Sequence, residues 1–125
     1  MLADKAAMAT IAVKDIDAAK NFYGEVLGLK KFREMGGDVA VYGSGNSAML
    51  IYKSEFAGTN KATSATWGVG DEFESIVKSL KNEAVSFEHY DMPGLSRQGD
   101  TYVSGDFKAA WFKDPDGNIL HINNQ

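Results

Sequence analysis

Two histidines and two tryptophans carry much of the chemistry available to this chain, and His121 is the most informative of them. It ends the segment 117–121, Gly-Asn-Ile-Leu-His, whose apolar residues predict a strand. An imidazole there could act as a general base, anchor a ligand or bind a metal, or it could only hydrogen-bond to a neighbour. His89 stands between Glu88 and Tyr90, a setting that favours a surface position. The lack of cysteine excludes disulfides, zinc-thiolate sites and a cysteine nucleophile.

Trp111 is the second candidate, because an indole can stack on a planar ligand and donate one N–H. It precedes Phe112 on a predicted strand, so the two side chains point to opposite faces of the sheet. A position in the core or in a dimer interface explains a tryptophan equally well. Arg97 and Asp100 lie in the polar stretch 91–100, which reads as a loop long enough to reach over a pocket. Solvated loop charges are the plainer interpretation of both residues.

An internal repeat must position these residues. Segments 10–15 and 66–71 share a skeleton, each leads into a run with helical spacing, and a Gly-Asn pair comes late in each half. A strand, a helix and three strands, used twice, predict two copies of one supersecondary unit. The two βαβββ modules span about 7–53 and 63–124. We place both in a single domain, residues 1–125, because each module alone would be marginal in size.

Both predicted helices have recognisable ends. Asp15 is a suitable N-cap for a helix over 16–27, and Gly28 suits its C-terminal end. Asp71 and Glu74 have the spacing of a capping box at the start of the second helix.

Strand alternation then predicts which residues share a face. One set, containing Ile11, Trp67 and Leu120, packs under the helices, so Trp67 is expected in the core. The other set, containing Met8, Ser64 and His121, lines the opposite, concave face. A mixed sheet covered by helices on one side must place its second face against solvent, a ligand or a partner. The expected fold class is therefore α+β, with a sheet that has one concave face free of helices.

The motifs of both modules resemble the vicinal oxygen chelate superfamily, which includes glyoxalase I, bleomycin-resistance proteins, fosfomycin-resistance proteins and extradiol dioxygenases. The matching segments are 13–17, 22–23, 26–29 and 112–118, and with the repeat they span nearly the whole chain. The resemblance implies paired βαβββ modules that form a curved mixed sheet with a cleft, and this cleft holds a divalent metal or an organic ligand. Phe112 matches the family's core position, which places Trp111 in that cleft.

The resemblance also implies where metal ligands would lie, on the first and last strands of each module. His, Gln or Glu are usual there, whereas this chain has Met8, Met49, Ser64 and His121. Only His121 suits a hard or borderline divalent ion, and catalytic metal sites normally have three good protein donors. We therefore expect no metal and no cofactor, with both methionines forming an apolar, adaptable cleft floor.

Composition excludes several other classes of function. A formal net charge of −4 argues against a nucleic-acid partner. No run of eighteen apolar residues predicts a membrane span, and the N-terminus does not resemble a signal peptide, so a cytoplasmic protein is expected. The glycines at 43–46 precede a predicted strand and not a helix, which rules out a dinucleotide-binding turn.

The leading hypothesis is a metal-free protein that binds a small organic ligand, aromatic ligands included, between its modules. The expected ligand-binding residues are His121, Trp111, Met8, Met49 and Ser64. The alternatives are a lyase, isomerase or dioxygenase of the superfamily that uses His121, or a module whose second face serves only oligomerisation. Exposed strand edges also favour a homodimer.

Overall fold

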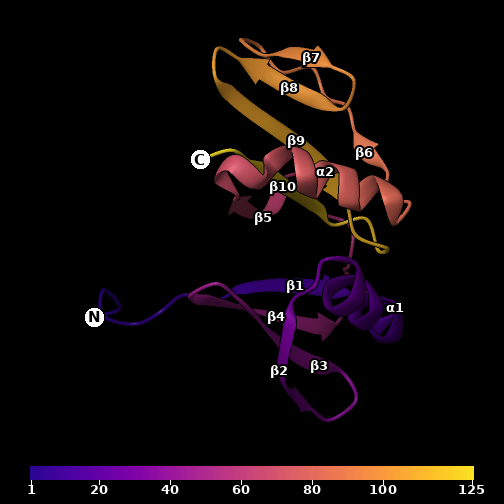
Figure 1. Cartoon of the computed structure of the whole chain (residues 1–125). Coiled ribbons are helices and arrows are strands. Elements are labelled where there is room, and N and C mark those ends of the chain that lie inside the picture. Colours follow the sequence, from indigo (N-terminus) through magenta and orange to yellow (C-terminus); the bar gives the residue numbers. More distant parts are fainter. The chain divides into compact units, whose positions relative to one another are not determined.

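The computed structural model describes all residues, 1–125, and has the α+β architecture that the sequence predicts (Figure 1). The chain forms two compact units. Unit 1 comprises Met1–Asn60 together with Pro115–Asn118, and unit 2 comprises Lys61–Asp114 together with Ile119–Gln125. Each unit contains one mixed sheet and its own helices, so each is described by itself.

Unit 1 contains a four-stranded sheet in the order β1-β4-β3-β2, in which β1 and β4 are parallel and the other pairs antiparallel. Its elements are β1 (Ala9–Val13), α1 (Ile16–Lys20), η1 (Asn21–Val26), β2 (Lys30–Met35), β3 (Val39–Ser44) and β4 (Ser47–Lys53). Helix α1 packs on β4. The core of the unit lies between them, where Ile11 and Ile51 pair across the strands and are both buried.

The first helix has the expected cap but changes type within its length. Asp15 accepts a hydrogen bond from the Ala18 N–H at 3.0 Å, which confirms it as the N-cap. A continuous α-helix over 16–27 is wrong, because the α-helix ends at Lys20 and continues as the π-helix η1. Gly28 follows with φ of 74°, a conformation that glycine adopts without strain.

Unit 2 contains a larger sheet in the order β5-β10-β9-β8-β7, with β6 also paired to β9. Its elements are β5 (Thr63–Gly68), η2 (Gly70–Glu72), α2 (Phe73–Asn82), β6 (Phe87–Glu88), β7 (Ser96–Gln98), β8 (Thr101–Ser104), β9 (Phe107–Lys113) and β10 (Ile119–Asn123). Strands β5 and β10 are parallel, as β1 and β4 are in unit 1. The repeated order of strand, helix and strands is thus present in both units.

Two local predictions in unit 2 are wrong. The capping box does not form, because a 3-10 turn comes first and α2 begins at Phe73 without a side-chain cap. Glu74 instead pairs with Lys108 on β9. The stretch 91–100 is not a plain loop either, since Ser96–Gln98 forms β7 and pairs with β8.

The turn between β9 and β10 packs within unit 1. The Asn118 side chain is buried and donates to the Ala12 carbonyl at 2.7 Å. Gly58, with φ of 73°, lies so close to the Asp116 carbonyl oxygen that a Cβ atom would overlap it. This turn therefore holds the end of β1 and the segment after β4.

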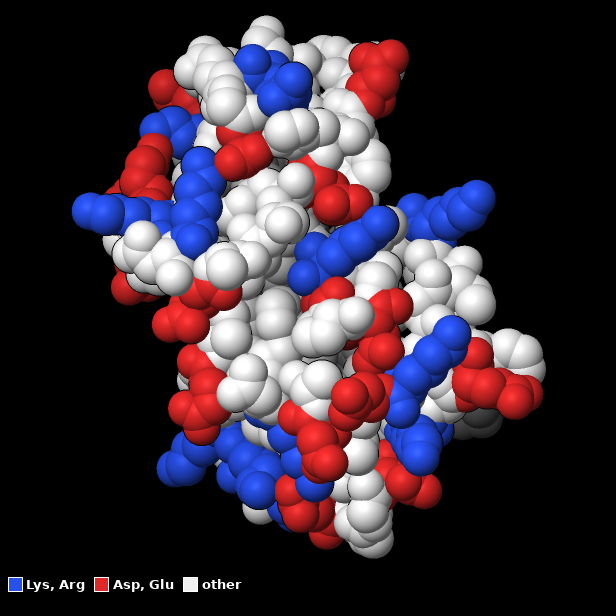
Figure 2. All heavy atoms as spheres, turned by 90° about the vertical axis from the view of Figure 1, so that its right-hand side faces the viewer, with Lys and Arg blue, Asp and Glu red and all other residues white.

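The surface carries both signs of charge. On the face drawn in Figure 2, basic and acidic side chains are interspersed without an extended basic patch. None of the helices is long and apolar enough to cross a membrane.

Candidate functional site

Trp111 and His121 lie side by side on one face of the sheet in unit 2. They are direct partners in the antiparallel pair β9·β10, so their side chains point the same way. Their rings stack at 4.3 Å between centroids with 25° between planes. Both side chains are 9% exposed.

This face is the one turned away from α2. Phe112 and Leu120 pair on the opposite face, next to Phe87. Lys81 of α2 lies over the Phe87 ring at 5.8 Å, which identifies that opposite face as the helix-covered one. Strand alternation therefore separates the site from the main core, as the sequence predicts.

His121 has a defined tautomer. Its Nδ1 lies 3.1 Å from the Ala110 carbonyl oxygen, which can only accept, so Nδ1 carries the proton. Its Nε2 lies 3.3 Å from the Asn123 side-chain nitrogen and accepts from it. Burial lowers the pKa of His121, opposed by the hydrogen bond to Ala110, and the ring is therefore neutral at pH 7.

Trp111 is surrounded by aromatic rings, and its Nε1 donates to the Thr63 hydroxyl at 3.2 Å. Tyr102 and Tyr90 meet it edge to face, at 5.2 and 6.2 Å between centroids. Such pairs contribute about 1 kcal/mol beyond the area they bury. We call Tyr90, Tyr102, Trp111 and His121 the aromatic cluster.

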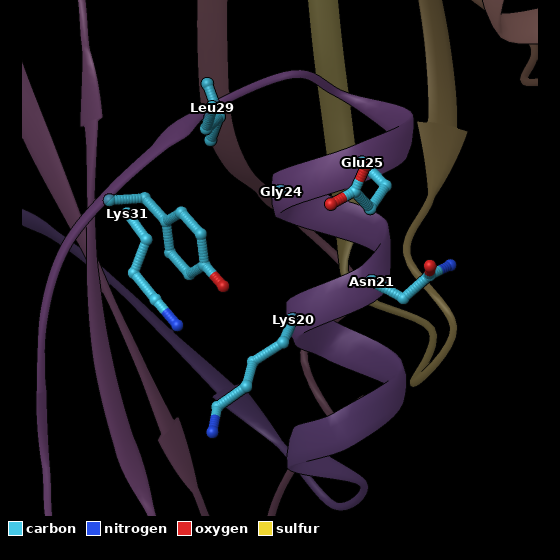
Figure 3. Close-up of a pocket in the computed structure, with 7 residues that line it drawn as sticks. Lys20, Asn21, Gly24, Glu25, Leu29 and Lys31 are labelled. Carbon is cyan, nitrogen blue, oxygen red and sulfur yellow. The ribbon is translucent and has the colours of Figure 1, made fainter.

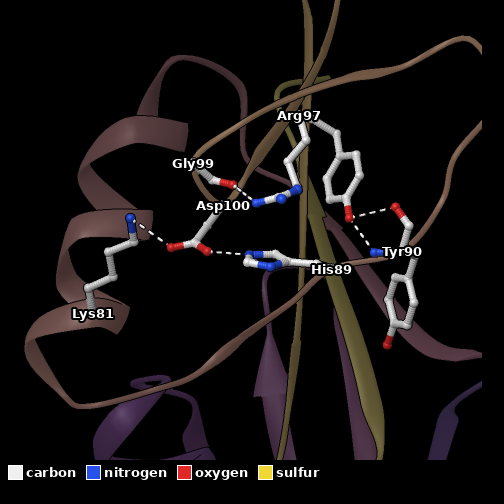
Figure 4. A network of polar contacts seen from close by, with 7 residues as sticks. Lys81, His89, Tyr90, Arg97, Gly99 and Asp100 are labelled. Carbon is white, nitrogen blue, oxygen red and sulfur yellow. Dashed lines mark hydrogen bonds and ion pairs between the residues drawn. The ribbon is translucent and has the colours of Figure 1, made fainter.

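The two tyrosines have different roles. The Tyr102 hydroxyl accepts from the Tyr90 N–H and donates to the Tyr90 carbonyl at 2.8 Å, so it fixes the backbone after β6 (Figure 4). The Tyr90 hydroxyl is buried and has no hydrogen-bond partner. Burial, followed by the charge of Glu88, raises the pKa of Tyr90, so the phenol remains protonated at neutral pH. A buried O–H without a partner is rare and calls for an explanation.

A polar network lies beside the cluster (Figure 4). Asp100 binds His89 at 2.6 Å and Lys81 of α2 at 3.0 Å. These contacts, the one to His89 first, lower the pKa of Asp100. The Arg97 guanidinium donates to the Gly99 carbonyl at 2.8 Å. Asp100 therefore links the β7–β8 turn to α2 within unit 2.

Met8 and Met49 do not share a face. Met49 pairs directly with Ala9 and lies, buried, on the helix-covered face with Ile11, so the predicted placement on the opposite face is wrong. Met8 comes just before β1 and is 39% exposed.

The reason for the error is a register shift in unit 2. Ile119 pairs with Thr63 but Leu120 pairs with Ala65, so Ser64 is an extra residue without a partner in the ladder. This bulge moves the pairing by one residue, so His121 lies opposite Thr66. Thr66 corresponds to Thr10 in the repeat, whereas Met49 lies opposite Ala9, which is on the other face of β1. Matching Met49 with His121 by their distance from the Gly-Asn pairs therefore assigns Met49 to the wrong face.

The residues present do not fit the divalent-metal site that the resemblance implies. No group of three or more His, Asp or Glu side chains is close enough to hold a metal ion. Both ring nitrogens of His121 already have protein partners. Ser64 would add only a neutral hydroxyl, and Met49 a buried thioether, both poor ligands for such an ion.

Sequence reasoning missed Tyr90, Tyr102 and Asn123 as parts of this site. Alternation places Asn123 on the same face as His121, which was the one available signal. The contacts of Tyr90 and Tyr102 depend on strand pairing that spacing alone does not reveal.

Solved structures share this fold at low sequence identity. A glyoxalase family protein from Enterococcus faecalis is 21% identical, with a TM-score of 0.72 over 98% of this chain and 99% of that one. A lactoylglutathione lyase from Agrobacterium tumefaciens is 18% identical, with a TM-score of 0.68 over 97% and 94%. The fosfomycin resistance protein FosX from Mesorhizobium loti is 10% identical, with a TM-score of 0.71 over 98% and 92%.

The sequence itself places the chain in a family. No curated protein matches it. A family model described as the glyoxalase/bleomycin resistance protein/dioxygenase superfamily, however, matches residues 5–122, which is nearly the whole chain. The chain therefore belongs to the glyoxalase/bleomycin resistance protein/dioxygenase superfamily.

Proposed function

We propose that this chain binds a small planar organic molecule at the aromatic cluster of unit 2 without the help of a metal. The observation that carries the proposal is the buried Tyr90 hydroxyl, which has no partner in the protein. A ligand with a carbonyl or similar acceptor would supply that partner. The Trp111 ring, which meets the Tyr90 ring edge to face, and the His121 ring stacked on Trp111 suit a flat, partly apolar body.

The charge state of the cluster favours a neutral ligand. His121 is neutral because burial lowers its pKa, and Tyr90 is protonated because burial raises its pKa. No ammonium or guanidinium group is among the four members of the cluster. One O–H donor and several ring faces therefore define the ligand's chemistry.

The test follows Trp111 fluorescence during titration with 2-naphthamide, a planar neutral carbonyl compound. A Trp67→Phe background leaves Trp111 as the only tryptophan. We expect saturable quenching, and a roughly tenfold higher Kd in Tyr90→Phe, since about 1.4 kcal/mol is one hydrogen bond's contribution. His121→Ala should also weaken binding while the circular dichroism spectrum is retained. Tyr52→Phe, at a half-exposed tyrosine of unit 1, is the matched control.

Metal dependence is examined on the same titration curve. Protein treated with EDTA should bind 2-naphthamide with an unchanged Kd. Binding that disappears after EDTA and returns with Mn²⁺ or Zn²⁺ would contradict the metal-free part of the proposal. Quenching that is equal in the parent and in Tyr90→Phe would contradict the proposal that the Tyr90 hydroxyl binds the ligand.

We also propose that the chain forms a homodimer through the sheet of unit 1. The face of this sheet opposite α1 carries Val41 and Leu50, and Phe32 adds exposed aromatic surface there. Strand β2 is an open edge of the sheet. Light scattering should give twice the chain mass of 13.6 kDa at micromolar concentration. Phe32→Ser should lower that mass toward one chain, and a monomeric parent protein would refute the proposal.

A further inference from the structure

A hollow lies within unit 1. It has a volume of about 420 Å³ and is formed between the helix α1–η1 and strands β2 and β3 (Figure 3). Lys20, Gly24 and Glu25 line it from the helix, and Lys31 and Tyr42 line it from the strands. Its size falls within the range of pockets that hold small organic molecules.

The hollow depends on the irregular helix and on one glycine. The π-helix η1 spans Asn21–Val26, and short π-helical turns recur at functional sites. Gly24 lies in this turn beside Tyr42, so that a Cβ atom there would lie 3.5 Å from Tyr42 Cε1 and 3.9 Å from its hydroxyl oxygen. The missing side chain therefore leaves the space in front of the phenol open.

Hydrogen-bond donors are in excess around this space. Lys20 and Lys31 both bind the same oxygen of Glu34, at 2.9 and 3.0 Å. Each ammonium has three N–H donors and uses one of them there. The Tyr42 hydroxyl lies close to Gly24 of the helix, and burial raises the pKa of Tyr42, so that the hydroxyl too remains a donor. The helix and strands β2 and β3 thus present several unused hydrogen-bond donors to the hollow.

We propose that this hollow binds a small organic acid. Its carboxylate takes hydrogen bonds from Lys20 and Lys31, and its apolar body lies against Leu29 and the Tyr42 ring. The Glu25 carboxylate at the same hollow disfavours ligands with more than one negative charge. A monocarboxylate with a flat or branched body therefore matches the site better than phosphate does.

The test is a titration of the full chain with sodium benzoate, followed by amide chemical shifts in ¹H–¹⁵N spectra. We expect saturable shifts for residues of η1, β2 and β3. Lys31→Met and Lys20→Met should each raise the Kd at least fivefold, because each removes one ammonium donor. Glu34→Gln should lower the Kd, since it frees both ammonium groups. Lys53→Met, which removes an exposed lysine of the same unit outside the hollow, should leave the Kd unchanged.

A Gly24→Ala variant separates binding from folding. Alanine favours a helix over glycine, and its Cβ makes only an ordinary contact with Tyr42, so the thermal midpoint should not fall. The added methyl group narrows the hollow, and the Kd for benzoate should rise several-fold. A variant that is as stable as the parent and binds benzoate more weakly would be hard to explain by a purely structural role.

Three results would overturn the proposal: no saturable shifts with benzoate, equal weakening by Lys31→Met and Lys53→Met, or saturation by inorganic phosphate but not by benzoate. The Trp111 fluorescence of unit 2 should not respond to benzoate. The two binding proposals can therefore fail independently.

Discussion

We expect the Gly58→Ala substitution to lower the free energy of unfolding by more than about 2 kcal/mol. Gly58 has φ of 73°, where a residue with a Cβ atom is strained. The new Cβ would also overlap the Asp116 carbonyl oxygen, which is backbone and cannot rotate away as a flexible side chain can. The turn between β9 and β10 would have to shift, and the bond from Asn118 to the Ala12 carbonyl would be disturbed. Urea denaturation of both proteins measures the difference.

Gly36→Ala is the matched control for this substitution. Gly36 has φ of 63°, close to that of Gly58, but nothing lies within 4 Å of its added Cβ. Gly36→Ala therefore has the conformational cost of a positive φ, about 1 kcal/mol, without an overlap of the new Cβ atom with backbone. Equal losses in the two variants would show that the close approach to Asp116 contributes nothing. A larger loss at Gly58, with an unchanged denaturant slope, would show that the turn is a fixed part of unit 1.

The sequence predicts the architecture well because its strongest signals are local and periodic. Period-two alternation places Ile11 and Leu120 on the buried, helix-covered faces and His121 on the opposite one, and the strand pairs agree. Asp15 caps its helix as expected, since a cap needs only its own next three residues. The repeat predicts a strand, a helix and three strands in both halves. Unit 1 has that order, whereas unit 2 has a strand, a helix and five strands, β6 to β10.

The errors arise where pairing across the sheet decides the outcome. Equal spacing from the Gly-Asn pairs makes Met49 and His121 look equivalent, but the bulge at Ser64 shifts one ladder and not the other. Met49 is consequently a core residue of unit 1. A one-residue shift in register reverses the face of every later residue, and nothing in the alternation of β5 itself reveals it.

Short sequence patterns also do not predict the type of a helix or the polar contacts between distant residues. The apolar spacing of residues 16–27 fits an α-helix and a π-helix almost equally, so η1 was not expected. Asp71 and Glu74 have the right spacing for a capping box, yet Glu74 pairs with Lys108 from a distant strand. The bond between Tyr102 and the Tyr90 backbone likewise joins residues that no short motif connects.

The second large predicted effect is the loss of stability when the Tyr102 hydroxyl, which binds the Tyr90 backbone, is removed. We expect Tyr102→Phe to lower the free energy of unfolding by about 2 kcal/mol, because buried polar groups left without partners cost about 1–3 kcal/mol. The hydroxyl satisfies both the N–H and the carbonyl of Tyr90, and Tyr102 is 1% exposed. Removing one oxygen therefore leaves two backbone groups unpaired while the aromatic packing against Trp111 is retained. Denaturation with urea gives the loss, and amide exchange should accelerate at Tyr90.

Tyr52→Phe controls for the loss of a tyrosine hydroxyl as such. Tyr52 is 36% exposed, so its hydroxyl is open to water and the substitution should change stability by less than about 0.5 kcal/mol. In Tyr102→Phe the released segment should also loosen Tyr90 beside Trp111, so the near-ultraviolet circular dichroism of the tryptophan should weaken. If Tyr102→Phe is as stable as Tyr52→Phe and amide exchange at Tyr90 is unchanged, the hydroxyl does not fix the segment. The Tyr90 hydroxyl would then have no fixed position, and the main argument for a ligand at the aromatic cluster would fail.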